Sequence, residues 1–314
     1  MPDHVILFMK KKITIGIIIA CCIGVFIWIT VDQTSPADTD GLQVTASFYP
    51  LYYFTQQIGG DKVSVANITP AGVEPHDYEP TAKDVARIEN SRLLIVNGGG
   101  LEAWLENVRQ NITPGQTTIV TAGEGLPMQE VAEGGETISD PHVWLSPVLA
   151  RHMVDVIASA LTEADPSNGD YYGTNAQALQ NRLIALDTEY HRGLRSCTQR
   201  TFVTAHAAFH YLAVTYNLEQ LAITGISPES EPSPQELASI AEFAREHAVG
   251  YIFFEELVSP KLSETVAHEV GAQTLVLNPL EGLTSQDIAD GKDYFTEMKS
   301  NLTNLQTALE CQTP

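Results

Sequence analysis

The chain has 314 residues, 44% hydrophobic and 18% charged. This composition is typical of a folded globular protein, and the length is enough for about two domains. The formal net charge of −22 argues against a nucleic-acid partner, because such an acidic body is repelled by a polyanion.

The first 31 residues are predicted to be a targeting segment. Lys10, Lys11 and Lys12 precede a nearly continuous apolar run at 13–31, close to the roughly 20 residues that cross a bilayer. This length favours an uncleaved membrane anchor, and a cleaved signal peptide or lipidation at Cys21 are the alternatives. Each places the body outside the cytoplasmic membrane, either tethered to it or, after cleavage, periplasmic. The polar residues 32–41 are predicted to form a linker.

Residues 42–165 are predicted to form an N-terminal α/β lobe in which strands and helices alternate. Thr81 is the expected N-cap of a helix at 81–91, and Ser146 that of a helix at 146–165 with Pro147 in its first turn. Between these helices, 123–140 is predicted to be a polar acidic loop. The remaining elements are strands at 42–48, 63–70, 92–100 and 117–122 and helices at 49–60 and 101–111.

Residues 166–196 are predicted to be one long linking helix, followed by a C-terminal α/β lobe at 197–314. That lobe repeats the alternation and ends in a single helix at about 285–310, after strands at 200–206, 218–224, 249–256 and 272–278. Strands interleaved with helices predict parallel sheets. The expected fold is therefore α/β, with two lobes that each hold a parallel-type sheet flanked by helices and that one long rigid helix joins.

Two cysteines lie in the folded body, Cys197 and Cys311. In an exported protein this pair predicts a disulfide bond, which would tie the last helix to the start of the second lobe. Two buried free thiols are the alternative.

Three histidines and a glutamate stand in short distinctive phrases: His76 in EPHDYEP, His142 in DPHVWLSP, His206 in TAHAAFHYL and Glu281 in LNPLEGLT. Ligands in open α/β sheets bind beyond the carboxyl ends of strands, where these phrases are expected to lie. Three imidazoles and one carboxylate suit a divalent transition metal, zinc first and manganese less well. The sequence therefore predicts a metal site assembled in a cleft between the lobes.

Other residues near these phrases are candidates for supporting or alternative roles. Glu255 and Glu256 end a predicted strand and are the alternatives to Glu281 as the fourth ligand. Glu74 and Asp77 flank His76 and are candidates to orient its imidazole. His210 lies one helical turn after His206 and is interpreted as a supporting or structural residue, since no HExxH metalloprotease motif is present.

The body resembles the metal-binding subunit of ABC importers, and more narrowly the zinc-binding branch of that family. The matching phrases follow one another through nearly the whole body: FYPLYYFTQQIGGDKVSV, PAGVEPHDYEPTAKD, NGGGLEAWLE, DPHVWLSP, TAHAAFHYLA, GISPESEPSPQEL, FFEE and LNPLEGLT. The resemblance implies two α/β lobes with a metal ion in the cleft between them. It also carries the ligand role onto His76, His142, His206 and Glu281.

The resemblance further implies a function and its partners. We expect a high-affinity zinc receptor, not an enzyme, that acts as a monomer and delivers Zn²⁺ to an ABC permease and its ATPase. Manganese-binding members usually have a carboxylate where His206 stands, so the third imidazole favours zinc. Many zinc-binding members carry a His-rich loop where 123–140 has acidic residues instead, which either gather cations loosely or are only solvated. The alternative functions are a zinc metallohydrolase and a manganese-binding receptor or adhesin.

Overall fold

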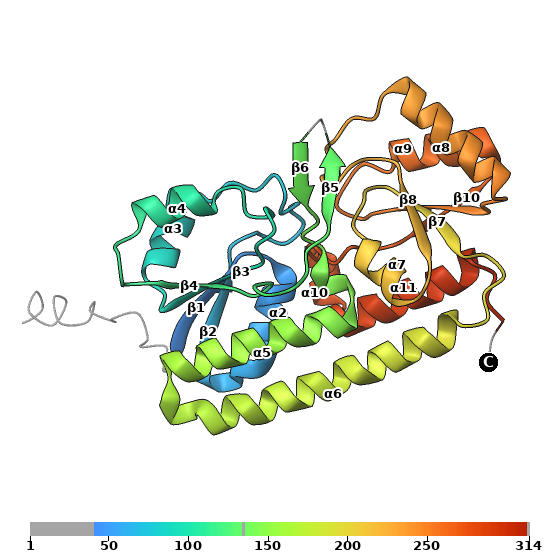
Figure 1. Ribbon diagram of the computed structural model, residues 1–314. Coiled ribbons are helices and arrows are strands. Elements are labelled where there is room, and N and C mark those ends of the chain that lie inside the picture. The colour runs from blue at the N-terminus through green and yellow to red at the C-terminus, as the bar shows by residue number, and fades with distance from the viewer. Residues whose placement is uncertain (1–40, 134–135, 313–314) are drawn as a thin grey trace, which may run out of the picture. The chain divides into compact units, whose positions relative to one another are not determined.

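A computed structural model describes residues 41–133 and 136–312 of the chain (Figure 1). Its body contains two four-stranded parallel sheets, each flanked by helices, and a long helix that passes from one to the other. The predicted fold class is thereby confirmed. The predicted targeting segment, 1–31, and all but the last residue of the linker lie outside the described residues. Within the described ranges, no helix is both long enough and apolar enough to cross a membrane.

The first lobe is built on a parallel sheet with strand order β2-β1-β3-β4. The helix α3 (Ala82–Glu89) begins where predicted, because Thr81 and Asp84 form a reciprocal capping box at its N-terminus. The strands are β1 (Leu42–Ala46), β2 (Val63–Asn67), β3 (Leu93–Val96) and β4 (Thr118–Thr121), and the helices are α2 (Tyr49–Gly59), the short 3₁₀ turn η1 (Gly60–Lys62), α3 (Ala82–Glu89) and α4 (Leu105–Asn111).

The second lobe repeats this topology with strand order β10-β9-β7-β8. In both sheets the strand that comes first in the chain lies between the second and the third, so each sheet has a switch point beside its first strand. The elements of the second lobe are β7 (Thr201–Thr204), α7 (His210–Thr215), β8 (Glu219–Ala222), α8 (Pro234–Glu246), β9 (Tyr251–Phe254), α9 (Lys261–Val270), β10 (Gln273–Val276), α10 (Ser285–Ala289) and α11 (Tyr294–Ala308).

Two antiparallel helices run beneath the sheets (Figure 1). They are α5 (Pro147–Ala164) and α6 (Gly169–Leu194), separated by the 3₁₀ turn η3 (Pro166–Asn168). With 26 residues, α6 spans about 39 Å at about 1.5 Å per residue. It packs against α2 of the first lobe and α11 of the second, through buried residues such as Leu179, Leu183 and Leu186. One continuous hydrophobic core therefore extends under both lobes.

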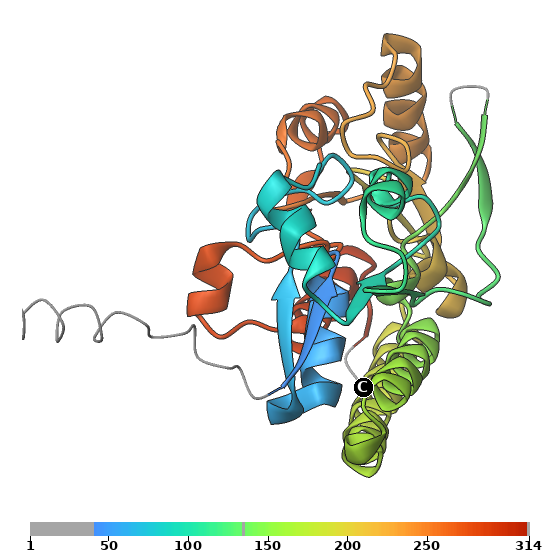
Figure 2. The same cartoon turned by 90° about the vertical axis from the view of Figure 1, so that its left-hand side faces the viewer.

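The segment predicted as an irregular acidic loop contains a β-hairpin. Its strands are β5 (Glu130–Glu133) and β6 (Glu136–Ser139), paired antiparallel, and they project away from the sheets (Figure 2). The loop prediction was wrong here because its acidic composition hid a hairpin signal. In the sequence, two short segments containing β-branched residues stand on either side of the dipeptide Gly-Gly at 134–135, a pair that favours hairpin turns.

The last helix, predicted as one element, is divided into α10 and α11. Thr284 caps the first helix and Asp293 caps the second, each through a capping box. Between them Gly291 has a φ of 75°, a left-handed conformation that ends a helix. Ser146 does stand at the N-cap of α5, but its side chain makes no cap bond and instead lies 3.1 Å from the Thr215 hydroxyl.

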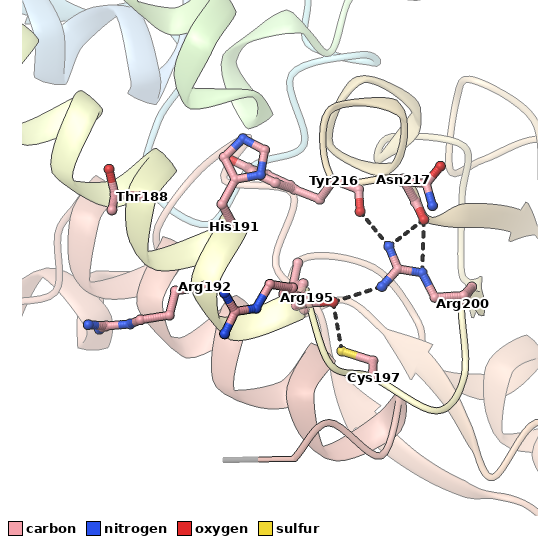
Figure 3. Close-up of a pocket in the computed structure, with 9 residues that line it drawn as sticks. Thr188, His191, Arg192, Arg195, Cys197, Arg200, Tyr216 and Asn217 are labelled. Carbon is pink, nitrogen blue, oxygen red and sulfur yellow. Dashed lines mark hydrogen bonds between the residues drawn. The ribbon is translucent and has the colours of Figure 1, made fainter. Parts of the chain in front are cut away.

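The end of α6 is joined to the C-terminus by the predicted disulfide bond between Cys197 and Cys311. Beside it lies a surface pocket of about 690 Å³ that contains Arg192, Arg195 and Arg200 (Figure 3). The guanidinium of Arg200 donates to the carbonyl oxygens of Leu194, Tyr216 and Asn217 at 2.5–3.0 Å. Arg200 thus ties the end of α6 to the connection between α7 and β8.

Candidate metal centre

Four side chains from distant parts of the chain converge on one point: His76, His142, His206 and Glu281. One possible ligand atom from each lies within 4.8 Å of those of the others. Among the histidine, cysteine and acidic side chains of the described residues, this is the one group that could hold a metal ion. The sequence predicted the same four residues.

The atoms at the centre are the Nε2 atoms of the three imidazoles and Oε1 of Glu281. Nε2 of His142 lies 3.2 Å from Nε2 of His76 and 3.2 Å from Nε2 of His206. Glu281 Oε1 is 3.3, 3.0 and 3.3 Å from the Nε2 atoms of His76, His142 and His206 in that order. A tetrahedral zinc ion with bonds of about 2.0–2.1 Å separates its ligand atoms by about 3.3–3.4 Å. The five separations, 3.0–3.3 Å, are close to this value.

The four candidate ligands are brought together by the carboxyl ends of strands and by the loops that follow them. His206 comes two residues after β7, the switch-point strand of the second sheet, and Glu281 lies in the loop after β10. His76 lies in the long loop after β2. His142 directly precedes the 3₁₀ turn η2 (Val143–Leu145), which leads into α5.

The cluster is closed to solvent. The side chains of His142 and His206 are 0% exposed and that of Glu281 is 1% exposed, whereas that of His76 is 8% exposed. His76 is therefore the member of the cluster nearest to water. A cation held among these four side chains would be shielded from hydration, so protein atoms would have to supply its coordination.

Two of the imidazoles are held by a buried carboxylate on the opposite ring nitrogen. Asp140 Oδ1 accepts from Nδ1 of His142 at 2.8 Å and from its backbone N–H at 3.0 Å. Glu255 Oε1 accepts from Nδ1 of His206 at 2.7 Å and from its backbone N–H at 3.2 Å. A proton on Nδ1 leaves the Nε2 lone pair free for a metal ion. Each carboxylate therefore fixes both the tautomer and the direction of its histidine.

The segment carrying His142 is also held by the first sheet. Asn97, directly after β3, donates from Nδ2 to the carbonyl oxygen of Pro141 at 2.8 Å. Its backbone N–H, in turn, donates to the buried Glu102 carboxylate at 2.7 Å, which also accepts from the Ser47 hydroxyl at 2.6 Å. Asn97 thus helps to position His142, which follows it by 45 residues.

The loops carrying His76 and Glu281 touch each other. The backbone N–H of Gly72 donates to the carbonyl oxygen of Leu283 at 3.0 Å. A Cβ on Gly282 would lie at an ordinary contact distance of 3.5 Å from the carbonyl oxygen of Val73 but only 3.1 Å from Leu257 Cδ1, so an added side chain would have to displace the end of Leu257. Glu74 accepts from the backbone N–H of His76 at 3.2 Å rather than from its ring.

Burial and mutual attraction shift the pKa values in the cluster. Burial opposes charging, but interactions with the histidines, above all His206, outweigh it and hold the pKa of Glu281 well below its usual range. For His206, burial is outweighed by Glu255 and Glu281, which raise its pKa. The pKa of His76 is lowered, first by burial. Burial and the Glu281 charge raise the pKa of Glu74 to about 10.

Several buried carboxylate oxygens around the cluster are available to interact with a cation. The second carboxylate oxygens of Glu74, Asp140, Glu255 and Glu281 are buried and have no hydrogen-bond partner among the described residues. The pKa of about 10 keeps Glu74 protonated near neutral pH, so three carboxylates stand around the three imidazoles, and a divalent cation would compensate their negative charge. The donor set of three nitrogens and one oxygen fits zinc, a borderline-soft metal.

The remaining predicted candidates lie around or outside the cluster. Glu255 stands behind His206, and Glu256 accepts from Asn278 at 2.8 Å, so neither offers an atom to the centre. Asp77 is exposed at the surface. His210 begins α7 and its ring lies against Tyr211, away from the central atoms.

Sequence reasoning missed two supporting residues, Asp140 and Asn97. Asp140 was counted only among the acidic residues of the loop, although it stands two positions before His142, a spacing that lets one side chain reach both the backbone and the ring. Asn97 gave a weaker signal, a polar residue at the end of a buried strand.

These observations define a class of protein: a two-lobed α/β protein with a closed His₃Glu site for a transition-metal ion between its halves. The comparisons with known proteins narrow the class. The family described as "Zinc-uptake complex component A periplasmic" matches residues 44–308, and the chain belongs to this family.

Individual relatives agree with this assignment. The chain is 39% identical to the high-affinity zinc uptake system protein ZnuA of Bacillus subtilis (strain 168), over 96% of this chain and 98% of that protein. It is 37% identical to the zinc-binding lipoprotein AdcA of Streptococcus pneumoniae, over 98% of this chain but 62% of that longer protein. The crystal structure of the Zn(II)-bound ZnuA-like domain of Streptococcus pneumoniae AdcA is similar, with a TM-score of 0.75 and 38% identity, covering 86% of this chain and 99% of that domain.

Proposed function

We propose that this chain is an extracytoplasmic zinc receptor that captures Zn²⁺ and delivers it to an ABC importer. The observation that carries the proposal is the closed centre formed by His76, His142, His206 and Glu281. Family membership and the zinc-binding names of the relatives support it. In this proposal the four side chains are the zinc ligands, and zinc is the cargo of the protein.

The position of Glu281 favours a receptor over a metallohydrolase. A catalytic zinc site has three protein ligands and a water molecule at an open position. Here Glu281 Oε1 lies within 3.3 Å of each imidazole Nε2, where it would occupy the fourth position itself. Four protein ligands and nearly complete burial suit capture and release of the ion, without any covalent chemistry.

The choice of zinc over manganese rests on His206. Manganese prefers oxygen ligands, whereas a third imidazole makes the site borderline-soft. Glu255 strengthens this preference. Its carboxylate accepts the hydrogen bond from Nδ1 of His206, which makes Nε2 of the same ring a stronger electron-pair donor to a metal ion. We therefore expect the protein to bind zinc far more tightly than manganese.

The binding test is a competition titration with a chromophoric zinc chelator, using His206→Ala and, as its matched control, His210→Ala. The two histidines stand four residues apart, but His210 contributes no atom to the cluster. Zinc at one equivalent in the wild type and in the control, with affinity lowered by at least about 100-fold in His206→Ala, is the expected result. Equal affinities for the two variants would refute the ligand assignment, and one equivalent of tightly bound manganese would refute the metal.

The proposal extends to the cellular setting. Residues 1–31 would hold the body at the outer face of the cytoplasmic membrane, as an anchor or a lipidated signal, or would export it if cleaved. The body would comprise lobes at 42–165 and 197–314 joined by 166–196, act as a monomer, and dock on a permease that its ATPase drives. Cell fractionation of the full chain and of a variant without residues 1–31 tests the location. Uptake of radioactive zinc by cells lacking the chain tests delivery.

A further inference from the structure

The loop that carries Glu281 has a conformation that its own sequence disfavours. Leu280, directly before Glu281, has a φ of 55°, in the left-handed region that residues with a Cβ rarely adopt. Its side chain is also fully buried. A conformation of this kind persists only where the surroundings impose it. The residues that impose it here decide where the fourth ligand lies.

One of these residues is Asn301 on α11. Its Nδ2 donates to the carbonyl oxygen of Asn278 at 2.6 Å, and its Oδ1 accepts from the backbone N–H of Asn278 at 2.8 Å. The side-chain amide thus pairs with both backbone groups of one residue, as a neighbouring strand would. Asn301 is 1% exposed and Asn278 is 3% exposed, so water does not compete for these bonds. The start of the loop, directly after β10, is fixed by this pair.

The side chain of Asn278 then fixes the next turn. Its Oδ1 accepts from the backbone N–H of Leu280 at 2.7 Å, which holds Leu280 in its left-handed conformation. Its Nδ2 donates to Glu256 at 2.8 Å, which fixes the orientation of the amide. Between them, the carbonyl oxygen of Pro279 accepts from the Trp144 indole N–H at 2.8 Å. Glu281 is the residue that follows this braced turn.

We propose that Asn301 and Asn278 are positioning residues for the fourth zinc ligand. Neither touches the metal centre; they act by holding the loop so that Glu281 Oε1 meets the three imidazoles. The inference rests on the proposed function, since it assumes that the centre binds zinc. It also assigns a role to Glu256, which lies outside the centre but anchors the Asn278 amide.

The test compares Asn301→Ala with Asn304→Ala. Asn304 lies three residues later on the same helix and its Nδ2 donates at 2.9 Å to the carbonyl oxygen of Val276, within β10 and before the loop begins. Asn301→Ala loses two hydrogen bonds from α11, both to Asn278 at the start of the loop, whereas Asn304→Ala loses one, to β10. Zinc affinity should fall about 10- to 100-fold in Asn301→Ala, as when outer partners of metal ligands are removed, and stay within about twofold in Asn304→Ala.

A double-mutant cycle shows whether the effect passes through the ligand. If Asn301 acts by positioning Glu281, then Asn301→Ala should have little further effect on zinc affinity in a Glu281→Ala background. Visible absorption of the Co²⁺-loaded protein should change in Asn301→Ala as it does in Glu281→Ala, and not in Asn304→Ala. A merely structural role would lower the stability of the metal-free protein without changing this spectrum.

Milder variants keep the test decisive if Asn301→Ala does not fold. Asn301→Asp keeps the acceptor for the Asn278 N–H but loses the donor, and Asn278→Ser keeps a side-chain oxygen that can accept from the Leu280 N–H without placing a carboxylate beside Glu256 and Glu297. Each should show a smaller loss of affinity than alanine at the same position. Wild-type affinity in Asn301→Asp and in Asn278→Ser, or a full additive loss in the double mutant, would overturn the inference. Absence of zinc binding in the wild type would instead refute the proposed function.

Discussion

The carboxylate of Asp140 offers a direct test of how the site is organised. Asp140→Asn keeps the shape of the side chain but removes its charge. The amide oxygen of this variant would still be able to accept from Nδ1 of His142, at the 2.8 Å now measured, but as a neutral partner. Hydrogen bonds to charged groups contribute about 1.5–3 kcal/mol and neutral ones about 0.5–1.5 kcal/mol. The bond to the backbone N–H of His142 keeps the same strength when the metal binds, whereas coordination at Nε2 makes the ring N–H more acidic and strengthens its bond to the carboxylate.

Only the ring bond therefore counts, and the expected loss is about 1–2 kcal/mol of zinc binding, or roughly 5- to 30-fold in Kd. Competition with a zinc chelator at about pH 8, where fewer protons compete for the imidazoles, measures it. Asp155→Asn is the matched control, because Asp155 accepts a 2.8 Å bond from Gln180 far from the centre. An affinity within about twofold of wild type in a folded Asp140→Asn would refute the argument that Asp140 directs the His142 lone pair.

Three further predictions concern stability. First, hydrogen bonds from Ser167, Asn168 and Tyr172 lower the pKa of Asp165 to about 2. The lowered value means that its stabilisation is fully present above the unfolded pKa of about 4 and is lost as the pH falls toward 2. Urea unfolding between about pH 5 and 2.5 should show a smaller loss of stability in Asp165→Asn than in the wild type, and parallel curves would contradict the shift. Second, the double variant Cys197→Ser with Cys311→Ser removes the disulfide bond, which closes a loop with a sequence separation of 114. Its loss should lower the free energy of unfolding by up to about 4–5 kcal/mol and the melting temperature by roughly 10 °C. An unchanged melting temperature would show that the bond does not stabilise the fold. Third, removal of zinc by a chelator should lower stability by about 4 kcal/mol relative to protein with free zinc at about 1,000 times Kd, and a metal-independent melting curve would contradict tight binding.

The clustering of the four candidate ligands could be predicted from the sequence because of where parallel strands end. His206 and Glu281 follow strands of one sheet, and the carboxyl ends of parallel strands open on the same edge. His76 and His142 were found from their local phrases, and the resemblance placed them in the same cleft. The alternation of strands and helices likewise predicted both sheets, although not their strand order, which depends on pairing between distant segments.

The supporting carboxylates were harder to predict because they depend on tertiary pairing. Glu255 reaches His206 across 49 residues only because β9 lies beside β7 in the sheet, with Val203 paired to Ile252. In sequence it looked like another ligand, since a carboxylate at a strand end fits either role. Asp140 is close to His142 in sequence, but a count of loop charges concealed its separate function. The hairpin was missed for a similar reason, because composition outweighed the local Gly-Gly signal.

In the proposed function, the division of the candidate ligands across the long helix limits how the metal ion would leave. His76 and His142 precede α6, whereas His206 and Glu281 follow it, so each half of the chain supplies two of the clustered side chains. Separation of the halves would break hydrogen bonds that cross between them, from Trp144 to Pro279, from Tyr294 to Trp144 and from Tyr53 to Asp293. Movement of the His76 loop alone would break the bond from Gly72 to Leu283, but among the described residues the imidazole of His76 has no carboxylate on Nδ1, and it is the most exposed of the three. In the proposed receptor, the ion would therefore leave by movement of this loop, with α6 in place.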